Sequence, residues 1–286
     1  MELRGHRLLA GIGGAAVAGS LLLGQAGIAA AAPSWRASGT QTASPPPGST
    51  YKPVHKILKF GMHGPNIKAL QHRLHYLHYF VGEINGRFGW DLQEAVWAFK
   101  EVQWGREAPR HPNRVDAMTQ HSLVHPRAPR VLFPHGGSLR IEINKKIEVL
   151  VLYKHDKVKL ISHVSTAAWR RPDGVGFFTP GGFHRAIHYI PGKVADNSFG
   201  RSFMYWPVFF IGYTYAVHGF PNPKWHNRFY GVPLKPASHG CVRIPLDLSK
   251  ILHSYLRIGP NGTPIWIYPE TTPAGKVRLL RPGHPG

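Results

Sequence analysis

The chain has 286 residues, of which 43% are hydrophobic, so it is long and apolar enough to bury a core in one large domain or two ordinary ones. Its 35 Lys and Arg residues against 14 Asp and Glu residues give a formal net charge of +21, which favours polyanionic partners such as nucleic acid, anionic lipid or anionic cell-wall polymers. The chain contains one cysteine, Cys241, so an intramolecular disulfide is excluded and Cys241 has no disulfide partner.

Residues 1–32 have the pattern of a secretory signal peptide. Arg4 and Arg7 precede an apolar run over residues 8–26, and residues 29–33 offer an Ala-x-Ala-like cleavage site. The alternative is an uncleaved membrane anchor, because the run approaches the ~20 residues that span a bilayer. In both cases we expect the folded part to lie outside the cytoplasm, in the extracellular space or the cell wall, where nucleic acid is not an expected partner.

Residues 33–55 form a predicted linker, and residues 56–126 form a predicted helical domain. Pro, Ser, Thr and Gly dominate the linker, which cannot bury enough apolar surface to fold by itself. In the helical domain, apolar residues recur at one-face spacing after residues 64–66 and again after the turn at residues 85–89, and a third short helix is expected over residues 117–123. The residues on these two faces are Ile67, Leu70, Leu74 and Leu77, then Leu92, Val96 and Phe99.

Three short motifs of this domain resemble the three-helix peptidoglycan-binding module. Residues 61–74 read Gly-x-x-Gly-Pro-Asn-Ile-x-Ala-Leu-Gln-x-Arg-Leu, residues 85–89 read Asn-Gly-x-Phe-Gly, and residues 95–100 read Ala-Val-x-Ala-Phe-Lys. The family has a Gly-x-Val/Ile-Gly-Pro turn before its last helix, where this chain has Arg114-Val115-Asp116. The resemblance implies binding to the cell wall, and a helical packing domain without its own ligand is the alternative.

After a second predicted linker over residues 127–137, residues 138–270 are typical of a mostly-β domain, and residues 271–286 form a basic tail. Strand-like runs with turn residues between them favour a sandwich- or barrel-like sheet with one helix. We therefore expect an α+β protein of two domains, a small three-helix module followed by a mostly-β domain. The predicted strands cover residues 139–143, 147–153, 157–164, 184–190, 208–211, 214–217 and 264–268, and the predicted helix covers residues 246–256.

Residues 238–243 read Ser-His-Gly-Cys-Val-Arg and surround the only cysteine. A thiol with the usual pKa of about 8.5 is only a few per cent ionised at neutral pH, so a nucleophilic Cys241 needs a base. His239 lies on the same face as Cys241 if the segment is extended. His218 ends a strand-like run and precedes Gly219, so it can lie on a neighbouring strand beside the thiol.

The neighbours of the thiol are candidates for binding substrate. Gly240 has no Cβ, so its backbone can approach a reacting carbonyl, and the amides of Gly240 and Cys241 are candidate donors to an oxyanion. Arg243 can bind a substrate carboxylate through two hydrogen bonds and favour the thiolate. The other candidate substrate-binding residues are Ser238, Tyr205 and Trp206.

The motifs of this half resemble the L,D-transpeptidase (YkuD-type) catalytic domain. They are Ser165-Thr166, Thr179-Pro180-Gly181-Gly182, His218-Gly219 and residues 238–243. The resemblance implies that Cys241 is the acylated nucleophile, that His218 accepts and donates the proton, and that the backbone carbonyl of Gly219 orients the His218 imidazole. It also implies that His239 and Gly240 belong to the floor and oxyanion side of the site.

The implied reaction is acyl transfer between peptidoglycan stem peptides. Cys241 attacks the carbonyl between the third and fourth residues of a stem tetrapeptide, D-alanine leaves, and the side-chain amine of a second stem takes the acyl group to form a 3-3 cross-link. The reaction needs no metal or organic cofactor, and its partners are the stem peptides and the glycan. The chain departs from many members at Gly219, where they carry Ser or Thr, and at Arg243, where they carry Asn.

Three other functions stay open at this point. His218, His239, His226 and Cys241 could bind zinc, although no short-spacer pair of ligands stands on each side. Water could replace the amine as acceptor, which would make the protein a cysteine L,D-carboxypeptidase or hydrolase on peptidoglycan. The protein could also be a non-catalytic wall-binding protein that uses only its basic charge and its helical domain.

Overall fold

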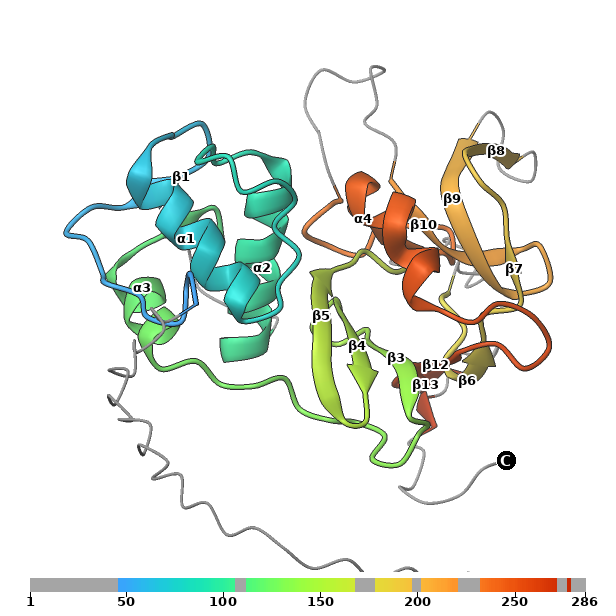
Figure 1. Ribbon diagram of the computed structural model, residues 1–286. Coiled ribbons are helices and arrows are strands. Elements are labelled where there is room, and N and C mark those ends of the chain that lie inside the picture. Colours follow the sequence, from blue (N-terminus) through green and yellow to red (C-terminus); the bar gives the residue numbers. More distant parts are fainter. Residues whose placement is uncertain are drawn as a thin grey trace, which may run out of the picture. The chain divides into compact units, whose positions relative to one another are not determined.

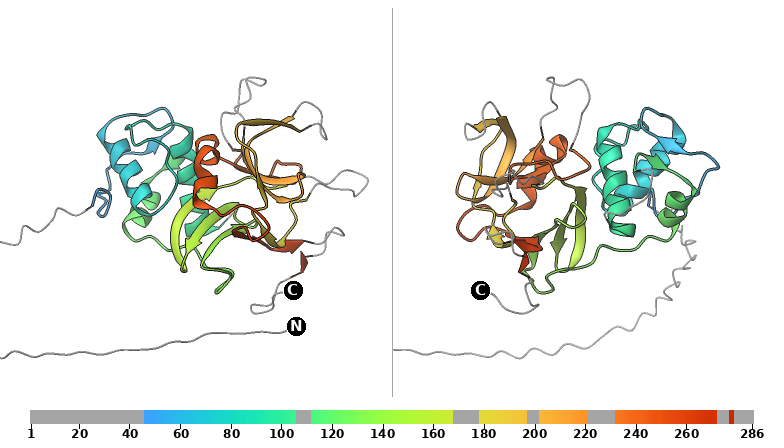
Figure 2. Two further views of the ribbon diagram at one scale, coloured as in Figure 1. Left: turned by 45° about the vertical axis from the view of Figure 1, so that its right-hand side comes forward. Right: turned by 180° about the vertical axis from the view of Figure 1, so that it is seen from behind.

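The computed structural model describes residues 46–105, 112–167, 178–196, 202–220, 232–271 and 277–278, all within one compact unit, Ser44–Gly286. The expected signal peptide, most of the first linker and nearly all of the expected basic tail lie outside the described residues, so they stay predictions. Within the described ranges, no helix is both long enough and apolar enough to cross a membrane. Helices α1 to α3 form one group of elements, and two β-sheets form another (Figures 1 and 2).

Residues 46–126, called the helical module below, contain α1 (Pro65–Tyr76), α2 (Trp90–Trp104) and α3 (Ala117–Val124). Pro65 occupies the first helical position of α1, where a missing N–H costs nothing. The predicted third helix is present, and its N-cap is Asp116, whose carboxylate accepts the N–H of Thr119 at 2.9 Å. This cap starts α3 without the Gly-Pro turn of the family. The short strands β1 (Leu58–Lys59) and β2 (Arg114–Val115) pair antiparallel.

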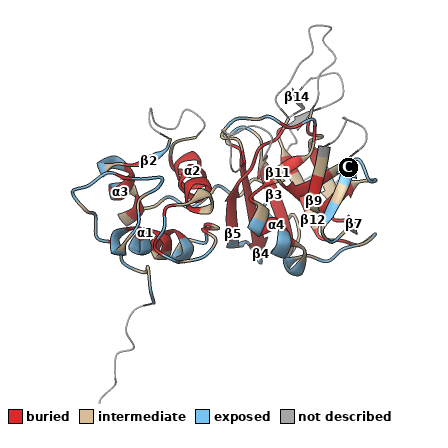
Figure 3. Cartoon of the chain, turned by 90° about the horizontal axis from the view of Figure 1, so that it is seen from above, coloured by how far each residue is buried: buried red, intermediate tan, exposed pale blue. Residues whose placement is uncertain are grey.

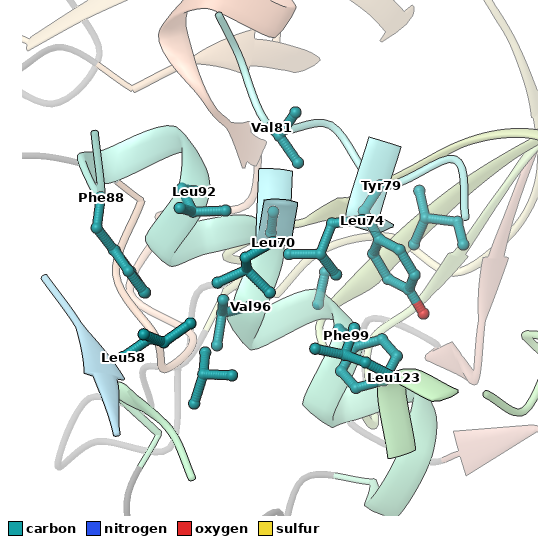
Figure 4. Packing of buried hydrophobic residues seen from close by; sticks show 14 of the residues in the cluster. Leu58, Leu70, Leu74, Tyr79, Val81, Phe88, Leu92, Val96, Phe99 and Leu123 are labelled. Atoms are coloured by element: carbon teal, nitrogen blue, oxygen red, sulfur yellow. The ribbon is translucent and has the colours of Figure 1, made fainter. Parts of the chain in front are cut away.

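The core of the helical module lies between the apolar faces of its helices. Leu70 and Leu74 of α1 pack with Leu92, Val96 and Phe99 of α2 (Figure 4). All seven residues that the helical spacing placed on the two faces belong to this cluster or pack against it. The opposite side of α1 is exposed (Figure 3). The periodic apolar pattern therefore marks the faces that form this core, although α2 is buried on its other sides as well.

The chain from residue 138 on, called the β module (residues 138–271 and 277–278), is built on two five-stranded sheets and is mostly β, as predicted. The first sheet has the order β5–β4–β3–β12–β6, with bounds β3 (Leu139–Asn144), β4 (Val149–Lys154), β5 (Lys157–His163), β6 (Gly182–Arg185) and β12 (Pro264–Tyr268). The second has the order β11–β10–β9–β7 with β8 also on β9, and bounds β7 (His188–Tyr189), β8 (Lys193–Asp196), β9 (Ser202–Ile211), β10 (Tyr215–Gly219) and β11 (Val242–Ile244). The remaining elements are α4 (Leu246–Leu252), the 3-10 turn η2 (His253–Tyr255), and the paired strands β13 (Glu270–Thr271) and β14 (Val277–Arg278).

One predicted strand is wrong: the run at residues 184–190 is two strands in different sheets. Its first part belongs to β6, which pairs with β12, and its second part is β7, which pairs with β9. Between them the amide of Ala186 donates to Thr263 O, and the amide of Ile187 donates to Phe209 O. The chain changes hydrogen-bonding partners at this point, which periodicity within one run cannot reveal.

Strand β4 is buried on both faces, which explains its uninterrupted apolar sequence. Leu150 and Leu152 pack in the core between the two sheets. Val149, Val151 and Tyr153, on the opposite face, belong to the same apolar cluster as the core of the helical module. In Figure 3, β4 is almost entirely coloured as buried. The helical module thus covers the outer face of β4 and β5 in the first sheet.

The helical module also pairs with the edge of that sheet. The amide of Phe80 donates to Ile161 O at 2.9 Å, and the amide of Ile161 donates to His78 O at 2.8 Å. These bonds satisfy backbone groups at the edge of β5, which would otherwise be open to pairing with another chain. The segment between the modules is held as well, since Gln103 exchanges hydrogen bonds with the backbone N–H and carbonyl of Arg127 at 2.8 and 3.0 Å.

A buried ion pair joins the two modules. His163, at the end of β5, places Nδ1 2.9 Å from a carboxylate oxygen of Glu101 on α2, and both side chains are buried. Burial alone would lower the pKa of His163, but Glu101 and the carbonyl of Pro233 outweigh it, so the pKa is raised to about 9. Glu94, also beside His163, has its pKa raised to about 8, mainly by burial.

This pair predicts that stability falls at alkaline pH. The folded pKa of His163 lies above its unfolded value of about 6.5, so its contribution is complete below that pH and is lost as the pH rises through about 9. The raised pKa of Glu94 acts in the same direction, between about 4.5 and 8. Thermal melts of wild type between pH 6.5 and 9.5 should therefore show a falling Tm, with a smaller fall in His163→Gln. His121→Gln, at an exposed histidine of α3, is the control. Equal pH slopes in wild type and His163→Gln would contradict the prediction.

Candidate active site

Parallel pairing of β10 with β11 builds the site. In this pairing Val217 lies opposite Val242, and His218 lies opposite Arg243. Val217 and Val242 face the core between the sheets, so His218, its neighbour along β10, belongs to the other face. The half-buried Cys241, just before β11, packs on that other face with Ala216, which precedes His218 by two positions. His218 and Cys241 therefore lie on one face of the second sheet.

His218 is held in one tautomer. Its imidazole is 5% exposed, and Nδ1 lies 2.8 Å from the carbonyl oxygen of Gly219. A carbonyl can only accept, so Nδ1 carries the hydrogen of this bond and Nε2 of the neutral ring is an acceptor. The contact that the family resemblance implies between His218 and Gly219 is thus present. The ring can take a proton only at Nε2.

Two groups that the sequence analysis passed over contact the thiol of Cys241. The sulfur lies 3.6 Å from the carbonyl oxygen of Thr214 and 4.0 Å from the sulfur of Met204 on β9. Burial raises the pKa of Tyr215, and the thiol adds to this effect. Met204 is one residue of an aromatic-rich strand, and Thr214 contacts the sulfur through its backbone carbonyl. The amino-acid sequence therefore gave no indication of either contact.

The tight loop before Cys241 uses its own polar groups. Ser238 donates from Oγ to Cys241 O at 2.6 Å, and the amide of Gly240 donates to the same Oγ at 3.1 Å. This differs from the expectation that the Gly240 amide is a donor to an oxyanion, because that N–H is already bonded to Ser238. Gly240 has φ +144°, and a side chain there would overlap the ring of Tyr215. His239 is exposed between the buried Ser238 and Gly240.

Arg243 supports this loop. One of its N–H groups donates to Ala237 O at 2.9 Å, and its guanidinium lies over the ring of Phe220 at 4.6 Å. Burial lowers the pKa of Arg243 to about 10, although the negative charge of the Cys241 thiolate acts in the opposite direction and raises it. A substrate carboxylate would have to bind the remaining N–H groups of Arg243.

The residues that follow strand β5 also hold the backbone before Cys241 in place. Ser165 and Arg243 exchange backbone hydrogen bonds at 3.0 Å. The carbonyl of Thr166 accepts the amides of Ala237 and Ser238 at 2.9 and 3.0 Å, and the buried carboxylate of Glu148 accepts the amide and hydroxyl of Thr166. The Ser-Thr motif of the sequence thus fixes the backbone that leads into Cys241.

Tyr205 and Trp206 contact other groups than the thiol. The ring of Trp206 lies 5.7 Å from Nζ of Lys250 on α4, and the ring of Tyr205 lies 5.9 Å from Nζ of Lys193. Trp206 has φ +46°, a local irregularity of β9. Met204, on the same strand, contacts the sulfur of Cys241.

The alternative zinc site is only partly described. His226 lies outside the described residues. Within the described part of the chain, no group of three or more His, Cys, Asp or Glu side chains is arranged to hold a metal ion.

Two parts of the chain match known protein families. Residues 138–276 match the family of the L,D-transpeptidase catalytic domain (YkuD), and residues 63–103 match the family described as "Putative peptidoglycan binding domain". The chain carries an L,D-transpeptidase catalytic domain. No curated protein matches the chain.

One solved structure supports this assignment. The L,D-transpeptidase of Xylanimonas cellulosilytica (its residues 123–326) matches with a TM-score of 0.60 and 28% identity over 76% of this chain and 100% of its own. An L,D-transpeptidase from Stackebrandtia nassauensis matches over 76% of this chain and 97% of its own, at 15% identity and a TM-score of 0.41. The protein is accordingly an enzyme, a peptidoglycan L,D-transpeptidase of the α+β class.

Gly219 and Ser249 are matched in shape, which predicts a compensating pair of substitutions. A methyl group on Gly219 would overlap Oγ of the buried Ser249 on α4. Gly219→Ala should therefore displace the carbonyl that holds His218 and lower kcat about 10–100-fold, because displacements of about 1 Å cost this much. Adding Ser249→Ala removes the overlapping oxygen and should restore several-fold of the loss, as a double-mutant cycle of cross-linking rates would show.

Gly89→Ala is the matched control for this cycle, because a side chain at Gly89 meets no atom within 4 Å. Additive effects of Gly219→Ala and Ser249→Ala would contradict the steric explanation.

Proposed function

We propose that Cys241 is the nucleophile and His218 the proton carrier of a two-step acyl transfer that forms 3-3 cross-links in peptidoglycan. One observation carries this assignment: the pairing of β10 with β11 brings both side chains to one face, with Nδ1 of His218 bonded to Gly219. Nε2 is then the ring nitrogen that can accept a proton.

In the first step, the thiol proton of Cys241 moves to Nε2 of His218, and the sulfur attacks the carbonyl between the third and fourth residues of a stem tetrapeptide. The C–N bond breaks, and His218 returns the proton to the departing amine of D-alanine. The product is a thioester on Cys241. The positive charge of Arg243 favours the thiolate by Coulomb attraction.

In the second step, the side-chain amine of another stem attacks the thioester. His218 takes a proton from this amine as the C–N bond forms, the C–S bond breaks, and His218 passes that proton to the leaving sulfur, which regenerates the thiol of Cys241. We propose the amide of Cys241 as a donor to the oxyanion of both steps. Gly240 contributes space beside Tyr215 rather than its amide, which Ser238 occupies.

Acylation by a carbapenem tests these roles, because the drug forms a covalent adduct with the nucleophile. The adduct is detected as an increase in the mass of the protein, which reports the first step. Wild type should gain the mass of the drug on Cys241, and Cys241→Ala should gain none and make no cross-links. His218→Ala should acylate about 10²–10⁴ times more slowly, the usual value of general-base help. His121→Ala, at an exposed histidine of α3 in the helical module, is the control and should acylate at the rate of wild type.

An adduct on Cys241→Ala, or unchanged acylation in His218→Ala, would refute the assignment. Analysis of the muropeptide products separates the two acceptors. Dimers support transfer to an amine, and trimmed monomers without dimers would instead support the hydrolytic alternative.

We also propose that the helical module binds the wall glycan and that the basic charge of the chain adds attraction to anionic wall polymers. A groove of about 880 Å³ is lined by Tyr76, Tyr79, His75 and residues of the segment 126–129. Tyr76 is 43% exposed there and offers a flat face for a sugar ring. The net charge of +21 supports the electrostatic part.

Co-sedimentation with purified cell-wall sacculi tests this proposal. Tyr76→Ala should lower the bound fraction, whereas Tyr255→Ala, an equally exposed tyrosine in η2 of the β module, should not. Binding should weaken with added salt, because exposed charges are screened beyond about 10 Å at 0.1 M. Equal loss in both tyrosine variants would contradict a site in the groove.

The cell wall is the location that these domains support. We propose that the N-terminal apolar run directs export, with retention at the membrane if the run is not cleaved.

A further inference from the structure

One stripe of α2 faces the β module instead of the core of its own module. Glu94, Trp97 and Glu101 stand three and four positions apart, so they share one side of the helix. All three are buried. The ring of Trp97 meets the imidazole of His163 at 5.3 Å, and the carboxylate of Glu101 meets Nδ1 of the same ring at 2.9 Å.

The stripe also reaches the backbone at Val232 and Pro233. A carboxyl oxygen of Glu94 accepts the amide of Val232 at 2.5 Å. Nε2 of His163 lies 3.0 Å from the carbonyl oxygen of Pro233. A carbonyl only accepts, so Nε2 carries a hydrogen, and the carboxylate of Glu101 at the other nitrogen favours a second one. The charged ring of His163 thus links α2 to Pro233.

These two residues begin residues 232–238, called the approach segment, which leads directly into Cys241. Farther along, the hydroxyl of Ser165 donates to Lys235 O at 3.0 Å and accepts the amide of Ala237 at 3.0 Å. The approach segment is therefore held from the β module at its end near Cys241 and from the helical module at its beginning. A shift at Val232 would be passed along a short, hydrogen-bonded path.

We propose that Glu94 and Glu101 are positioning residues for the transpeptidase reaction: they fix the start of the approach segment, directly at Val232 and through His163 at Pro233, and so set the position of Cys241 relative to His218. This inference rests on the proposed roles of Cys241 and His218. It gives the helical module a part in the reaction itself, in addition to wall binding.

Adhesion between the modules does not require this network. The modules already share an apolar cluster that includes Val151 and Tyr153 of β4. Burying two carboxyl groups and an imidazolium carries a desolvation cost that apolar residues of the same volume avoid. What a buried polar network adds is a single geometry, since each hydrogen bond accepts only one arrangement of its partners.

The test compares two substitutions at Glu94 in the full-length chain. Glu94→Gln keeps the oxygen that accepts from Val232, so kcat for cross-linking and the carbapenem acylation rate should stay within about twofold of wild type. Glu94→Leu removes the acceptor at similar volume and should lower both rates about tenfold or more, since small misplacements of reacting groups have effects of this size. KM should change less than kcat, because the stem-binding surface is untouched. Glu101→Leu should behave like Glu94→Leu.

Val151→Ala is the control for adhesion, because it weakens the apolar contact between the modules without touching the approach segment. At a temperature where all variants are folded, its kcat should match wild type even if its Tm falls as far as that of Glu94→Leu. Equal kcat in Glu94→Leu, Glu101→Leu and wild type, or an equal loss in Val151→Ala, would overturn the proposal. If Glu94→Leu does not fold, Glu101→Leu decides the same question. Cys241→Ala, assayed in parallel, shows separately whether the nucleophile assignment holds.

Discussion

The site depends on one register, the parallel pairing of β10 with β11. His218 and Cys241 come from separate parts of the chain, and this pairing places them on one face. The register is determined by burial, because Val217 and Val242 must both face the core between the sheets. A slip of one residue would turn His218 into that core and a valine toward the thiol. The hydrophobic effect thus sets the geometry of a polar site.

A second constraint is that β4 has no exposed face. The core between the sheets covers Leu150 and Leu152, and the helical module covers Val149, Val151 and Tyr153. Removing the helical module would expose the latter face together with the edge of β5, where Phe80 pairs with Ile161. The helical module is therefore part of the fold on which the site stands. Because α2 packs against the β module, carboxyl groups of this helix can reach the backbone that leads into the site.

Much of the fold could be predicted because local pattern and burial coincide. The faces of α1 and α2 and most strands followed from spacing, and the motif around Cys241 indicated the chemistry. Three features could not be predicted, because two depend on contacts between distant segments and one, within residues 238–241, depends on the backbone shape of a tight loop. They are the break between β6 and β7, the use of the Gly240 amide by Ser238, and the contact of Met204 with the thiol. The residues next to a backbone N–H in the sequence do not reveal which group will accept its hydrogen bond.

The polar groups of the site are arranged before any substrate binds. Nδ1 of His218 is bonded to Gly219, the amide of Gly240 to Ser238, and one N–H of Arg243 to Ala237. Each bond removes one alternative arrangement, so substrate binding need not supply the free energy to select the tautomer of His218 or the shape of the loop. The proposed reaction then uses Nε2 of His218 and the sulfur of Cys241. His218 lies in β10 and Cys241 immediately precedes β11, so the buried valines of these two strands fix the backbone that carries both of the proposed reacting groups.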